Sequence, residues 1–347
     1  MTVTIGVIGS GNFGRQLIKA FHETGLCRIK GIAARTPSKH RDMTEKYGAV
    51  ITDNYTELLR DNSIDAISVC GPLELQAAMV EEALAAGKHV LMEKPLAATM
   101  DDALRIKAAA DASDKLAMVG FIERFNPALL RIKALLRQDH LGKVFRLSIK
   151  RGSRLSERTP WMWEVGMYVH ILGHNIDILR WFLDDEVEHV YSESDGFMRP
   201  NRKETDNICC MLRFRNGAIA VMEDSWTLSP KMPMEENDCR LDLIGEKGNL
   251  STNMLSQMTS LCCEDKGWFY PSVLRWPGGL DEDGGVVSYA LKDECAYFLR
   301  AVRDRKLPPL SSVGSALENL RVAMACRKSS EEGRRVHMSE IEGAGHV

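Results

Sequence analysis

The sequence predicts an α/β protein in which a doubly wound parallel sheet is followed by a second α/β domain with a large, open, mostly antiparallel sheet. Three observations predict this fold. Short β-branched runs alternate with amphipathic helices over the first 120 residues, a glycine-rich turn follows the first run, and turn residues separate many strand-like runs in the second half. The pattern changes after Phe121, so we expect domains at residues 1–121 and 122–347.

The first domain should contain parallel strands joined by helices, because its apolar runs are short and are separated by segments with helical periodicity. A strong helix over residues 73–86 is followed by Gly87, a residue type that commonly ends helices. We expect strands at residues 3–8, 29–33, 66–70, 89–92 and 117–120, and helices at residues 13–23, 38–47, 55–60, 73–86 and 100–112.

The second domain is richer in strands, which indicates a large antiparallel or mixed sheet. Turn residues such as those at 215–217 and 245–248 separate its strand-like runs. We expect helices at residues 126–138, 167–183, 289–303 and 315–333, and strands at residues 144–151, 187–192, 207–213, 218–226, 240–244, 249–252 and 258–262.

Composition and charge exclude several classes of protein. Of the 347 residues, 44% are hydrophobic and 27% are charged, which is typical of globular proteins. The 45 Lys and Arg residues nearly balance the 48 Asp and Glu residues, and the net charge of −3 predicts no nucleic-acid partner. No apolar run reaches the roughly 18 residues of a membrane span, so we expect no membrane partner either.

The cysteines and the N-terminus indicate the compartment. The nine cysteines are odd in number and include no Cys-x-x-Cys pair, so we expect no disulfide framework. The first residues are typical of a strand and have no basic start, so we expect no signal peptide. We therefore expect a cytoplasmic protein with reduced cysteines.

A glycine-rich turn carries the first functional prediction. Gly9, Gly11 and Gly14 form a Gly-x-Gly-x-x-Gly pattern directly after the first strand and at the start of the first helix. The first glycine permits the tight turn, the second lets a pyrophosphate approach the backbone, and the third lets the helix pack against the strand. This context predicts a Rossmann dinucleotide-binding site that includes Asn12 and Phe13.

The end of the second strand predicts which dinucleotide is bound. Sites for NAD usually carry an acidic residue about 20 positions after the glycines, but Ala34 stands there. The polar residues that follow, Arg35, Thr36, Ser38 and Lys39, suit a 2′-phosphate instead. The sequence therefore favours NADP. NAD is the alternative, with an ordinary polar loop in which Arg35 stacks on adenine.

Two further stretches, taken with the glycine turn, carry a family resemblance. They are residues 86–97 (AGKHVLMEKPLA) and residues 166–177 (GMYVHILGHNID). Over nearly its whole length, the sequence resembles the Gfo/Idh/MocA oxidoreductases, the family of glucose–fructose oxidoreductase and inositol dehydrogenase. The resemblance implies an NAD(P)-dependent dehydrogenase that transfers a hydride between a nicotinamide and a sugar or cyclitol hydroxyl.

The resemblance also implies roles for individual residues. Lys94 matches the lysine near the reacting hydroxyl, where an amine stabilises the alkoxide that forms. Glu93 and Pro95 shape the turn that presents it, and Glu93 and Lys94 are expected beside the cofactor. His174 matches the histidine that commonly acts as acid and base. The segment whose backbone contacts the cofactor in the family corresponds to Cys70, Gly71 and Pro72.

One position departs from the family pattern. The residue four positions before the histidine is usually Asp, and here it is His170. Positions i and i+4 share a helix face, so His170 and His174 are both expected to contact the substrate. A histidine relays protons or binds hydroxyls, but it supplies no fixed negative charge. Asp177 either orients the His174 imidazole or is a carboxylate on the helix surface.

A narrower resemblance concerns the substrate. Residues 120–127 (GFIERFNP) and 164–166 (EVG) are similar to those of enzymes that act on nucleotide-activated amino sugars, with UDP-N-acetylglucosamine 3-dehydrogenases as the nearest type. This likeness implies that Arg124 lies near the nicotinamide and Asn126 near the substrate. Trp161 and Trp163 either stack on a sugar or pack in the core.

Three alternatives and one partner complete the expectations. The same fold can use a bound nicotinamide transiently, in epimerisation or glycoside cleavage, or can act as a non-catalytic cofactor-bound sensor because of His170. His170, His174 and Asp177 have the residue types of a two-histidine, one-carboxylate metal site, but the nicotinamide site leads us to expect no metal. We expect a homo-oligomer, a dimer or tetramer, formed through the C-terminal sheet.

Overall fold

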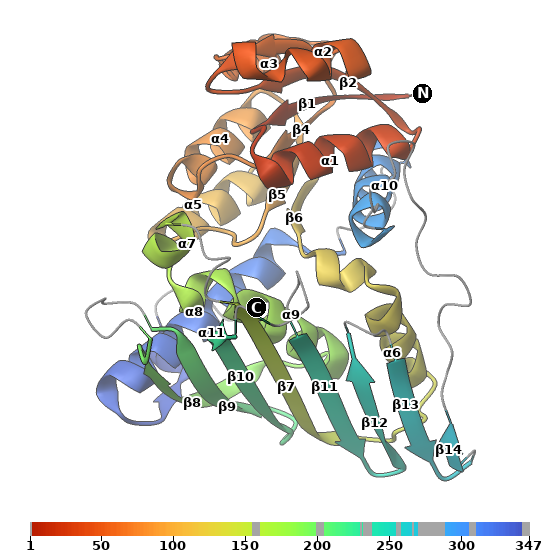
Figure 1. Cartoon of the computed structure of the whole chain (residues 1–347), viewed down its shortest axis with the longest axis vertical. Helices are drawn as coiled ribbons and strands as arrows, with labels where there is room; N and C mark the ends of the chain where they lie inside the picture. The colour runs from red at the N-terminus through yellow and green to blue at the C-terminus, as the bar shows by residue number, and fades with distance from the viewer. Residues whose placement is uncertain are drawn as a thin grey trace. The chain divides into compact units, whose positions relative to one another are not determined.

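The computed structural model in Figure 1 divides into two compact units. Unit 1 contains Met1–Phe125 and Pro277–Leu317, and unit 2 contains Asn126–Trp276 and Glu318–Val347. The structure describes residues 2–154, 160–198, 205–229, 231, 238–254, 258–265, 267–269, 289–304 and 310–341, with the backbone alone at residues 160, 161, 238, 269 and 289.

A six-stranded parallel sheet forms the centre of unit 1. Its strand order is β3-β2-β1-β4-β5-β6, so the connections leave the β1–β4 pair in opposite directions. In such sheets, ligands bind at the carboxyl ends of the two strands where the order reverses. The strands are β1 (Val3–Ile8), β2 (Cys27–Ala33), β3 (Val50–Thr52), β4 (Ala66–Val69), β5 (His89–Glu93) and β6 (Ala117–Gly120).

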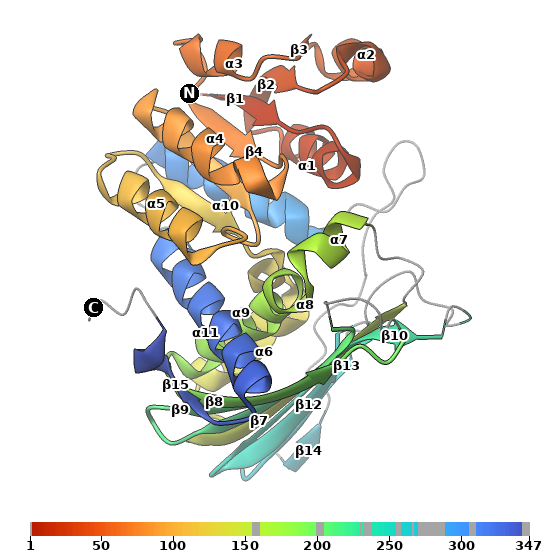
Figure 2. The ribbon, with the colours of Figure 1, turned by 90° about the vertical axis from the view of Figure 1, so that its left-hand side faces the viewer.

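Helices cover both faces of this sheet (Figure 2). One face carries α1 and α10, which pack against each other, and the opposite face carries α4 and α5. The apolar side of α1 buries Leu17, Ile18 and Phe21 in the core. The helices of unit 1 are α1 (Asn12–Glu23), η1 (Pro37–His40), α2 (Arg41–Tyr47), α3 (Thr56–Arg60), α4 (Leu73–Ala85), α5 (Met100–Asp111), η2 (Ile122–Phe125) and α10 (Tyr289–Asp304).

The extent of unit 1 differs from the sequence-based division at residue 121. The unit also takes in residues 277–317, which sequence reasoning left in the second domain. The physical reason lies in α10, which buries Phe298 and Leu299 in the same core as the α1 side chains. A helix's periodicity indicates that one side is buried, but it does not say against which sheet.

A nine-stranded sheet forms unit 2, in the order β14-β13-β12-β11-β7-β10-β9-β8-β15. All its neighbouring pairs are antiparallel except β7 with β10, which is parallel. The predicted fold class, a doubly wound parallel sheet followed by a mostly antiparallel one, is confirmed. The strands are β7 (Val144–Arg154), β8 (Val187–Asp195), β9 (Asn207–Phe214), β10 (Ile219–Leu228), β11 (Asp238–Gly245), β12 (Gly248–Asn253), β13 (Met258–Cys263), β14 (Gly267–Phe269) and β15 (Val336–His337).

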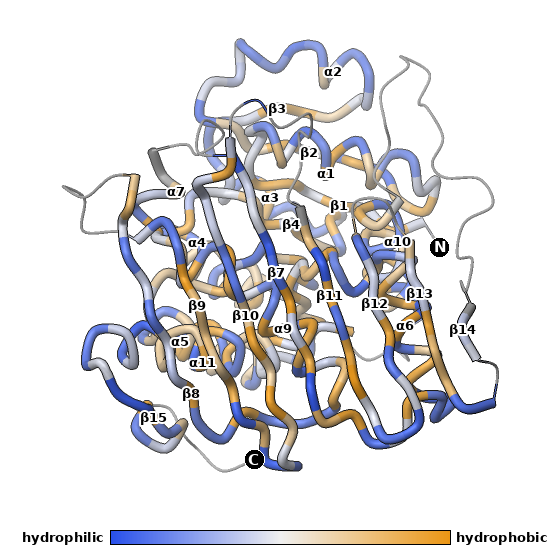
Figure 3. Tube along the Cα trace, turned by 60° about the horizontal axis from the view of Figure 1, so that its bottom comes forward, coloured by the Kyte–Doolittle hydropathy of each residue, from blue (hydrophilic) through white to orange (hydrophobic). Residues whose placement is uncertain are grey.

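One face of the nine-stranded sheet is covered by α6 (Pro127–Arg137), α9 (Leu172–Leu183) and α11 (Val313–Glu332), as Figure 2 shows. The core between them contains side chains from all three helices, such as Leu129, Ile176 and Val322. Along the strands, hydrophobic and hydrophilic residues alternate (Figure 3). The outward positions still include exposed apolar side chains, namely Tyr191, Met211, Ile219, Ile244 and Trp268.

The helix expected over residues 167–183 is interrupted, so this prediction is wrong in detail. Gly166, with φ +79°, precedes the short α8 (Met167–His170), and α9 begins at Leu172. The His174 backbone N–H donates to the Ile171 carbonyl over 3.2 Å, a tighter turn than an α-helix makes. A further short helix, α7 (Pro160–Val165), precedes this segment. His170 and His174 therefore belong to two successive helices.

Candidate cofactor and catalytic sites

The glycine-rich turn connects β1 to α1 where the strand order reverses. Gly9 has φ +108°, and a Cβ there would lie 2.1 Å from the Cys70 carbonyl oxygen at the end of β4. A Cβ on Gly14 would lie 2.5 Å from the Gly9 carbonyl oxygen. Both contacts are with backbone atoms, so any side chain at either position would displace the turn. These two glycines are required by the geometry.

Gly11, unlike Gly9 and Gly14, is not in close contact with the backbone of the described residues. A Cβ on Gly11 would meet no atom of the described residues within 4 Å, so it would point into open space. Gly11 precedes α1, and no side chain caps the N–H groups of the first turn. Exposed N–H groups at a helix N-terminus bind anions, and Asn12 and Phe13 are both exposed in this turn. The turn therefore fits the pyrophosphate of a dinucleotide.

The loop after β2 presents polar side chains to solvent. Ala34 is buried, and its N–H donates to the Thr52 carbonyl over 2.8 Å. The next polar residues, Arg35, Thr36, Ser38 and Lys39, are all exposed. Within the part of the chain that the structure describes, the Arg35 guanidinium makes no hydrogen bond or ion pair. The loop therefore offers a cation to an anionic ligand.

His40 connects this loop to the glycine turn, and sequence reasoning missed it. Its Nδ1 lies 2.9 Å from an Arg15 guanidinium nitrogen, and its Nε2 lies 3.1 Å from the Ser10 hydroxyl. Arg15 in turn pairs with Asp42 over 2.7 Å. Because a guanidinium can only donate, Nδ1 must accept, and the neutral ring donates from Nε2 to Ser10. The Ser10 hydrogen is then available to a ligand phosphate.

The segment after β4 lies beside the same turn. The Cys70 backbone N–H donates to the Ile8 carbonyl over 2.8 Å. Burial raises the pKa of the Cys70 thiol to about 12, with a smaller contribution from the Glu93 charge, so the sulfur stays protonated. A Cβ on Gly71 would lie 3.0 Å from the Met79 sulfur, and Pro72 precedes α4. This segment contributes backbone groups rather than a reactive thiol.

Lys94 directly follows β5, in a turn that Gln76 holds in place. Gln76 lies on α4, and only 2% of its surface is exposed. Its amide nitrogen donates to the carbonyl oxygens of Glu93, Pro95 and Leu96 over 3.0, 2.8 and 2.9 Å. These three carbonyls bracket Lys94, so Gln76 determines how the turn presents the lysine. Sequence reasoning gave Gln76 no role.

Arg124 lies on η2 and is buried. Its guanidinium donates to the Leu310 carbonyl over 2.5 Å and to the Ser315 hydroxyl over 3.2 Å. These contacts connect the two chain segments of unit 1, because Arg124 belongs to Met1–Phe125 and its two partners belong to Pro277–Leu317. A contact of Arg124 with the nicotinamide stays a prediction.

Asn126 has a structural contact that the sequence did not predict. Its side-chain oxygen accepts a hydrogen bond from the Ala128 backbone N–H over 3.0 Å, so it caps the N-terminus of α6. The expected helix therefore begins one residue later, at Pro127. A contact of Asn126 with the substrate stays a prediction.

The two histidines of unit 2 are both buried, with 6% of His170 and 9% of His174 exposed. The His170 ring meets the Trp226 ring edge to face, with centroids 5.9 Å apart. Trp163 also packs edge to face on Trp226, at 4.9 Å, and belongs to the core. Trp163 thus packs in the core, and a contact of Trp163 with a sugar stays a prediction. The side chain of Trp161 lies outside the described residues.

A buried polar network follows His174. The Asn175 amide nitrogen donates to both Asp224 carboxylate oxygens, over 2.9 and 3.0 Å, and its oxygen accepts from Arg151 over 3.0 Å. All three residues are almost fully buried. Burial raises the pKa of Asp224 to about 7, although the Arg151 charge and the Asn175 hydrogen bond act in the opposite direction. The network attaches the start of α9 to β7 and β10.

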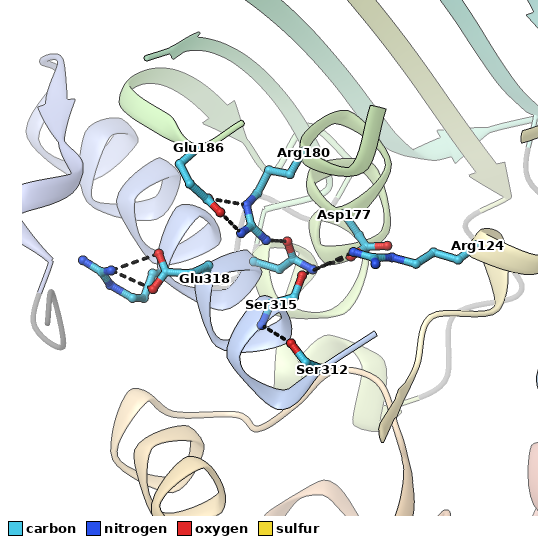
Figure 4. Close-up of polar contacts among 9 residues, drawn as sticks. Arg124, Asp177, Arg180, Glu186, Ser312, Ser315 and Glu318 are labelled. Atoms are coloured by element: carbon cyan, nitrogen blue, oxygen red, sulfur yellow. Dashed lines mark hydrogen bonds and ion pairs between the residues drawn. The ribbon is translucent and has the colours of Figure 1, made fainter. Parts of the chain in front are cut away.

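Asp177 takes part in a second buried network (Figure 4). It is fully buried and accepts a hydrogen bond from the Asn319 amide over 2.8 Å. The Asn319 oxygen accepts from Arg180, which makes a two-bond contact with Glu186. Of the two alternatives for Asp177, a carboxylate on the helix surface is therefore excluded, and the orientation of the His174 imidazole by Asp177 stays a prediction. Asp177 joins α9 to α11.

Two family models match this chain. The one described as "Oxidoreductase family, NAD-binding Rossmann fold" matches residues 3–121, and the one described as "GFO/IDH/MocA C-terminal domain" matches residues 129–251. Together they cover more than half of the chain. The chain belongs to the Gfo/Idh/MocA oxidoreductase family. The resemblance found in the sequence motifs is thus confirmed for the family, and the narrower resemblance to UDP-N-acetylglucosamine 3-dehydrogenases stays a prediction.

Named members of the Gfo/Idh/MocA family are similar to this chain. A protein named myo-inositol 2-dehydrogenase, from Thermotoga maritima, is 26% identical and covers 98% of this chain and 99% of its own length. An inositol 2-dehydrogenase/D-chiro-inositol 3-dehydrogenase from Shouchella clausii is 34% identical over 55% of this chain and 56% of its own. The solved structure of levoglucosan dehydrogenase in complex with NADH has a TM-score of 0.86 at 19% identity, covers 97% of this chain and 99% of its own, and shows the fold.

This member of the Gfo/Idh/MocA family is therefore an oxidoreductase with an NAD-binding Rossmann domain. Among the residues that the structure describes, no cluster of three His, Cys, Asp or Glu side chains is placed to bind a metal ion. None of the described helices is both long and apolar enough to span a membrane.

Proposed function

We propose that this chain is a dehydrogenase that oxidises a CH–OH group of a cyclitol or sugar with NAD(P), or catalyses the reverse reduction. The observation that carries the proposal is the Lys94 turn. It directly follows β5, an inner strand of the parallel sheet, and is held by a buried amide, as a reacting group requires. The relatives support the substrate class, because those that align over most of this chain include a protein named myo-inositol 2-dehydrogenase.

Lys94 and His174 have complementary roles in this proposal. The Lys94 ammonium stabilises the negative charge that develops on the substrate oxygen. The His174 imidazole removes the hydroxyl proton, and His170 relays it or binds a second hydroxyl. The nicotinamide, when bound, would supply the hydride acceptor. The backbone of Gly9, Gly11 and Gly14 would hold the pyrophosphate of the dinucleotide.

The experiment compares Lys94→Ala and His174→Ala with the parent enzyme on a panel of cyclitols and sugars. We expect each variant to lower kcat by about 10²–10⁴, because each loses a charge-stabilising or proton-transferring group. Cofactor affinity, measured by fluorescence titration, should be kept. Lys143→Ala and His140→Ala, which alter an exposed and a partly exposed residue elsewhere, are the matched controls. Turnover equal to the parent in either test variant contradicts the proposal.

NADP is the proposed cofactor, with NAD as the alternative. The support is the exposed loop after β2, in which Arg35 and Lys39 are cations and the position for a ribose-binding acid holds Ala34. A comparison of kcat/KM for the two cofactors tests this preference, and a clear preference for NAD rejects it.

Two other uses of the same fold predict different results. If the nicotinamide is used transiently, in epimerisation or glycoside cleavage, substrate is consumed without net change in absorbance of the reduced cofactor. If the chain is a sensor because His170 replaces the family Asp, activity arises only in His170→Asp. Nucleotide-activated amino sugars belong in the substrate panel for the same reason, since the motif at residues 120–127 favours them.

We also propose that two copies associate through the outer face of the nine-stranded sheet. Tyr191 and Met211 are paired across β8 and β9 there, with 40% and 52% of their surfaces exposed. Exposed apolar side chains on one face are typical of an interface. Light scattering after gel filtration should give the mass of a dimer or tetramer, and Met211→Glu should reduce it. A monomeric parent protein excludes this association.

A further inference from the structure

Two carboxylic acids meet inside unit 1, and the proposed mechanism uses neither. Glu93 ends β5 and Glu294 lies on α10, about 200 positions later in the chain. Both approach Gly120, the residue paired with Glu93 across β6. A Cβ on Gly120 would lie 3.0 Å from Glu93 Oε1 and 3.3 Å from Glu294 Oε1. The Oε1 atoms of Glu93 and Glu294 are therefore no farther apart than the sum of their distances from this Cβ position.

The burial of Glu93 and Glu294 is not compensated by hydrogen bonds within the described residues. Glu294 has none of its surface exposed. Within the described residues, Glu93 Oε1 and both Glu294 oxygens are buried and accept no hydrogen bond. Two ionised carboxylates at this separation in a dry interior would repel each other and would both lose their hydration. A carboxyl group that keeps its proton avoids both costs.

We propose that Glu93 and Glu294 together hold one proton at neutral pH, and that Glu294 is a positioning residue that controls the charge beside Lys94. The second part rests on the proposed function of Lys94. Burial raises the pKa of Glu93 to about 7, while the Lys94 charge and backbone N–H act in the opposite direction. Burial, followed by the Glu93 charge, raises the pKa of Glu294 well above its usual range.

Among the residues that the structure describes, Lys94 is the charge that acts on Glu93 and Glu93 is the charge that acts on Glu294. The neighbouring Cys295 thiol is fully buried, and burial together with both carboxyls raises its pKa, so it stays neutral. On the elements that pack against α10, Arg124 of η2 is bound to Leu310 and Ser315, and Arg15 of α1 is paired with Asp42. Lys94 is thus the cation that acts on Glu93, and the proton shared with Glu294 determines how much negative charge Lys94 meets.

Infrared spectroscopy of the full-length protein tests the shared proton directly. At pH 7.5 we expect the absorption band of a protonated carboxylic acid, and we expect Glu294→Gln to remove or shift it. Glu45→Gln, which alters an exposed carboxylate of the same unit, should leave the band in place. If the parent protein has no such band at this pH, the proposal is overturned. This readout needs no activity, so it stands even where Lys94 proves not to be catalytic.

Unfolding by urea between pH 5 and pH 9 provides the second measurement. The unfolded chain releases the Glu294 proton near the usual glutamate pKa, and the folded chain keeps it to a higher pH. The folding equilibrium constant of the parent should therefore fall by up to tenfold per pH unit relative to Glu294→Gln. The ratio of the folding equilibrium constants of the parent and Glu45→Gln should not change with pH. If the ratio of the folding equilibrium constants of the parent and Glu294→Gln is also independent of pH, the proposal is overturned.

The pH profile of kcat/KM tests the effect on Lys94. A glutamine at 294 stays neutral at every pH, whereas the parent Glu294 adds a second negative charge near Lys94 once it loses its proton at alkaline pH. Lys94 should therefore lose its proton more easily in Glu294→Gln, and the alkaline limb of the profile should move to lower pH in that variant and stay in place in Glu45→Gln. An unmoved limb overturns the positioning role. Parent-like activity of Lys94→Ala would instead contradict the proposed function, while the infrared result would still report on the pair.

Discussion

The Gln76 side-chain amide donates a hydrogen bond to the Pro95 carbonyl over 2.8 Å, next to the lysine proposed to act on the substrate. The same nitrogen reaches the carbonyls of Glu93 and Leu96. A single side chain from α4 therefore fixes the backbone on both sides of Lys94. Since the hydrogen bonds to Pro95 and Leu96 are buried, no solvent replaces the amide there if it is lost.

Gln76→Leu should lower both stability and turnover. The leucine fills a similar volume but leaves buried carbonyl groups unsatisfied, which costs about 1–3 kcal/mol. A turn that shifts by a fraction of an ångström also misplaces Lys94, so kcat should fall more than KM changes. Thermal unfolding and steady-state kinetics measure the two effects. Leu75→Ala, at an exposed neighbour on the same helix, is the control; equal behaviour of the two variants would exclude this role for Gln76.

Gly9→Ala and Gly11→Ala should separate folding from cofactor binding. The alanine methyl at position 9 would lie 2.1 Å from a backbone oxygen at φ +108°, so this variant should unfold at a much lower temperature or fail to fold. The methyl at position 11 meets no described atom within 4 Å, so Gly11→Ala should unfold near the parent temperature. It should nevertheless bind the cofactor at least tenfold more weakly, because the methyl enters the space left for the pyrophosphate.

Thermal scans and fluorescence titration with the reduced cofactor measure both properties. Unchanged affinity in Gly11→Ala would mean that the dinucleotide does not approach this turn. A normal unfolding temperature in Gly9→Ala would show that the turn tolerates a side chain.

The elements that sequence reasoning predicted well are those whose signals are local. The glycines at 9, 11 and 14 lie between an apolar strand and a helix, and the pattern needs no knowledge of distant residues. Gly87, with φ +72°, ends the predicted helix as expected. By contrast, β3 has three residues, and the apolar run at this place, residues 49–51, is too short to predict a strand.

The missed features depend on contacts between distant positions. Gln76 acts on carbonyls 17 to 20 positions later, and Glu294 meets Glu93 because α10 returns to the first core. Both side chains are polar residues on helices, and their burial becomes visible once the helices are placed. The break between α8 and α9 was missed because apolar residues continue across it without a proline.

Arg35→Ala should change the choice of cofactor. The Arg35 side chain is exposed at the end of β2, next to the loop that carries Ser38 and Lys39. If it binds a 2′-phosphate, its removal should lower kcat/KM for NADP by about 10–100-fold and leave that for NAD within a few fold, since a hydrogen bond to a charged group contributes about 1.5–3 kcal/mol. Arg28→Ala, at the other end of the same strand, is the matched control. Equal losses with both cofactors would indicate stacking on adenine instead.

Asp224 should make the stability of the protein depend on pH. Burial raises its pKa to about 7 in the folded chain, compared with about 3.9 for an unfolded aspartate. Because the folded value is the higher one, the folded protein keeps a proton that the unfolded chain releases. The stabilising contribution of this proton is fully present below about pH 4 and is lost as the pH rises through 7.

Asp224→Asn removes this dependence, although it also weakens the contact with Asn175, because the new side-chain NH2 group cannot accept the hydrogen bond that the Asn175 amide donates. The variant should therefore be less stable than the parent at pH 4, and the gap should narrow by up to about 1.4 kcal/mol per pH unit as the pH approaches 7. Urea unfolding at several pH values measures the gap. Asp242→Asn, at an exposed carboxylate on β11, should differ from the parent in its free energy of unfolding by an amount that does not change with pH. A gap that instead widens from pH 4 to pH 7 would mean that Asp224 is ionised in the folded state, with Arg151 outweighing the cost of burial.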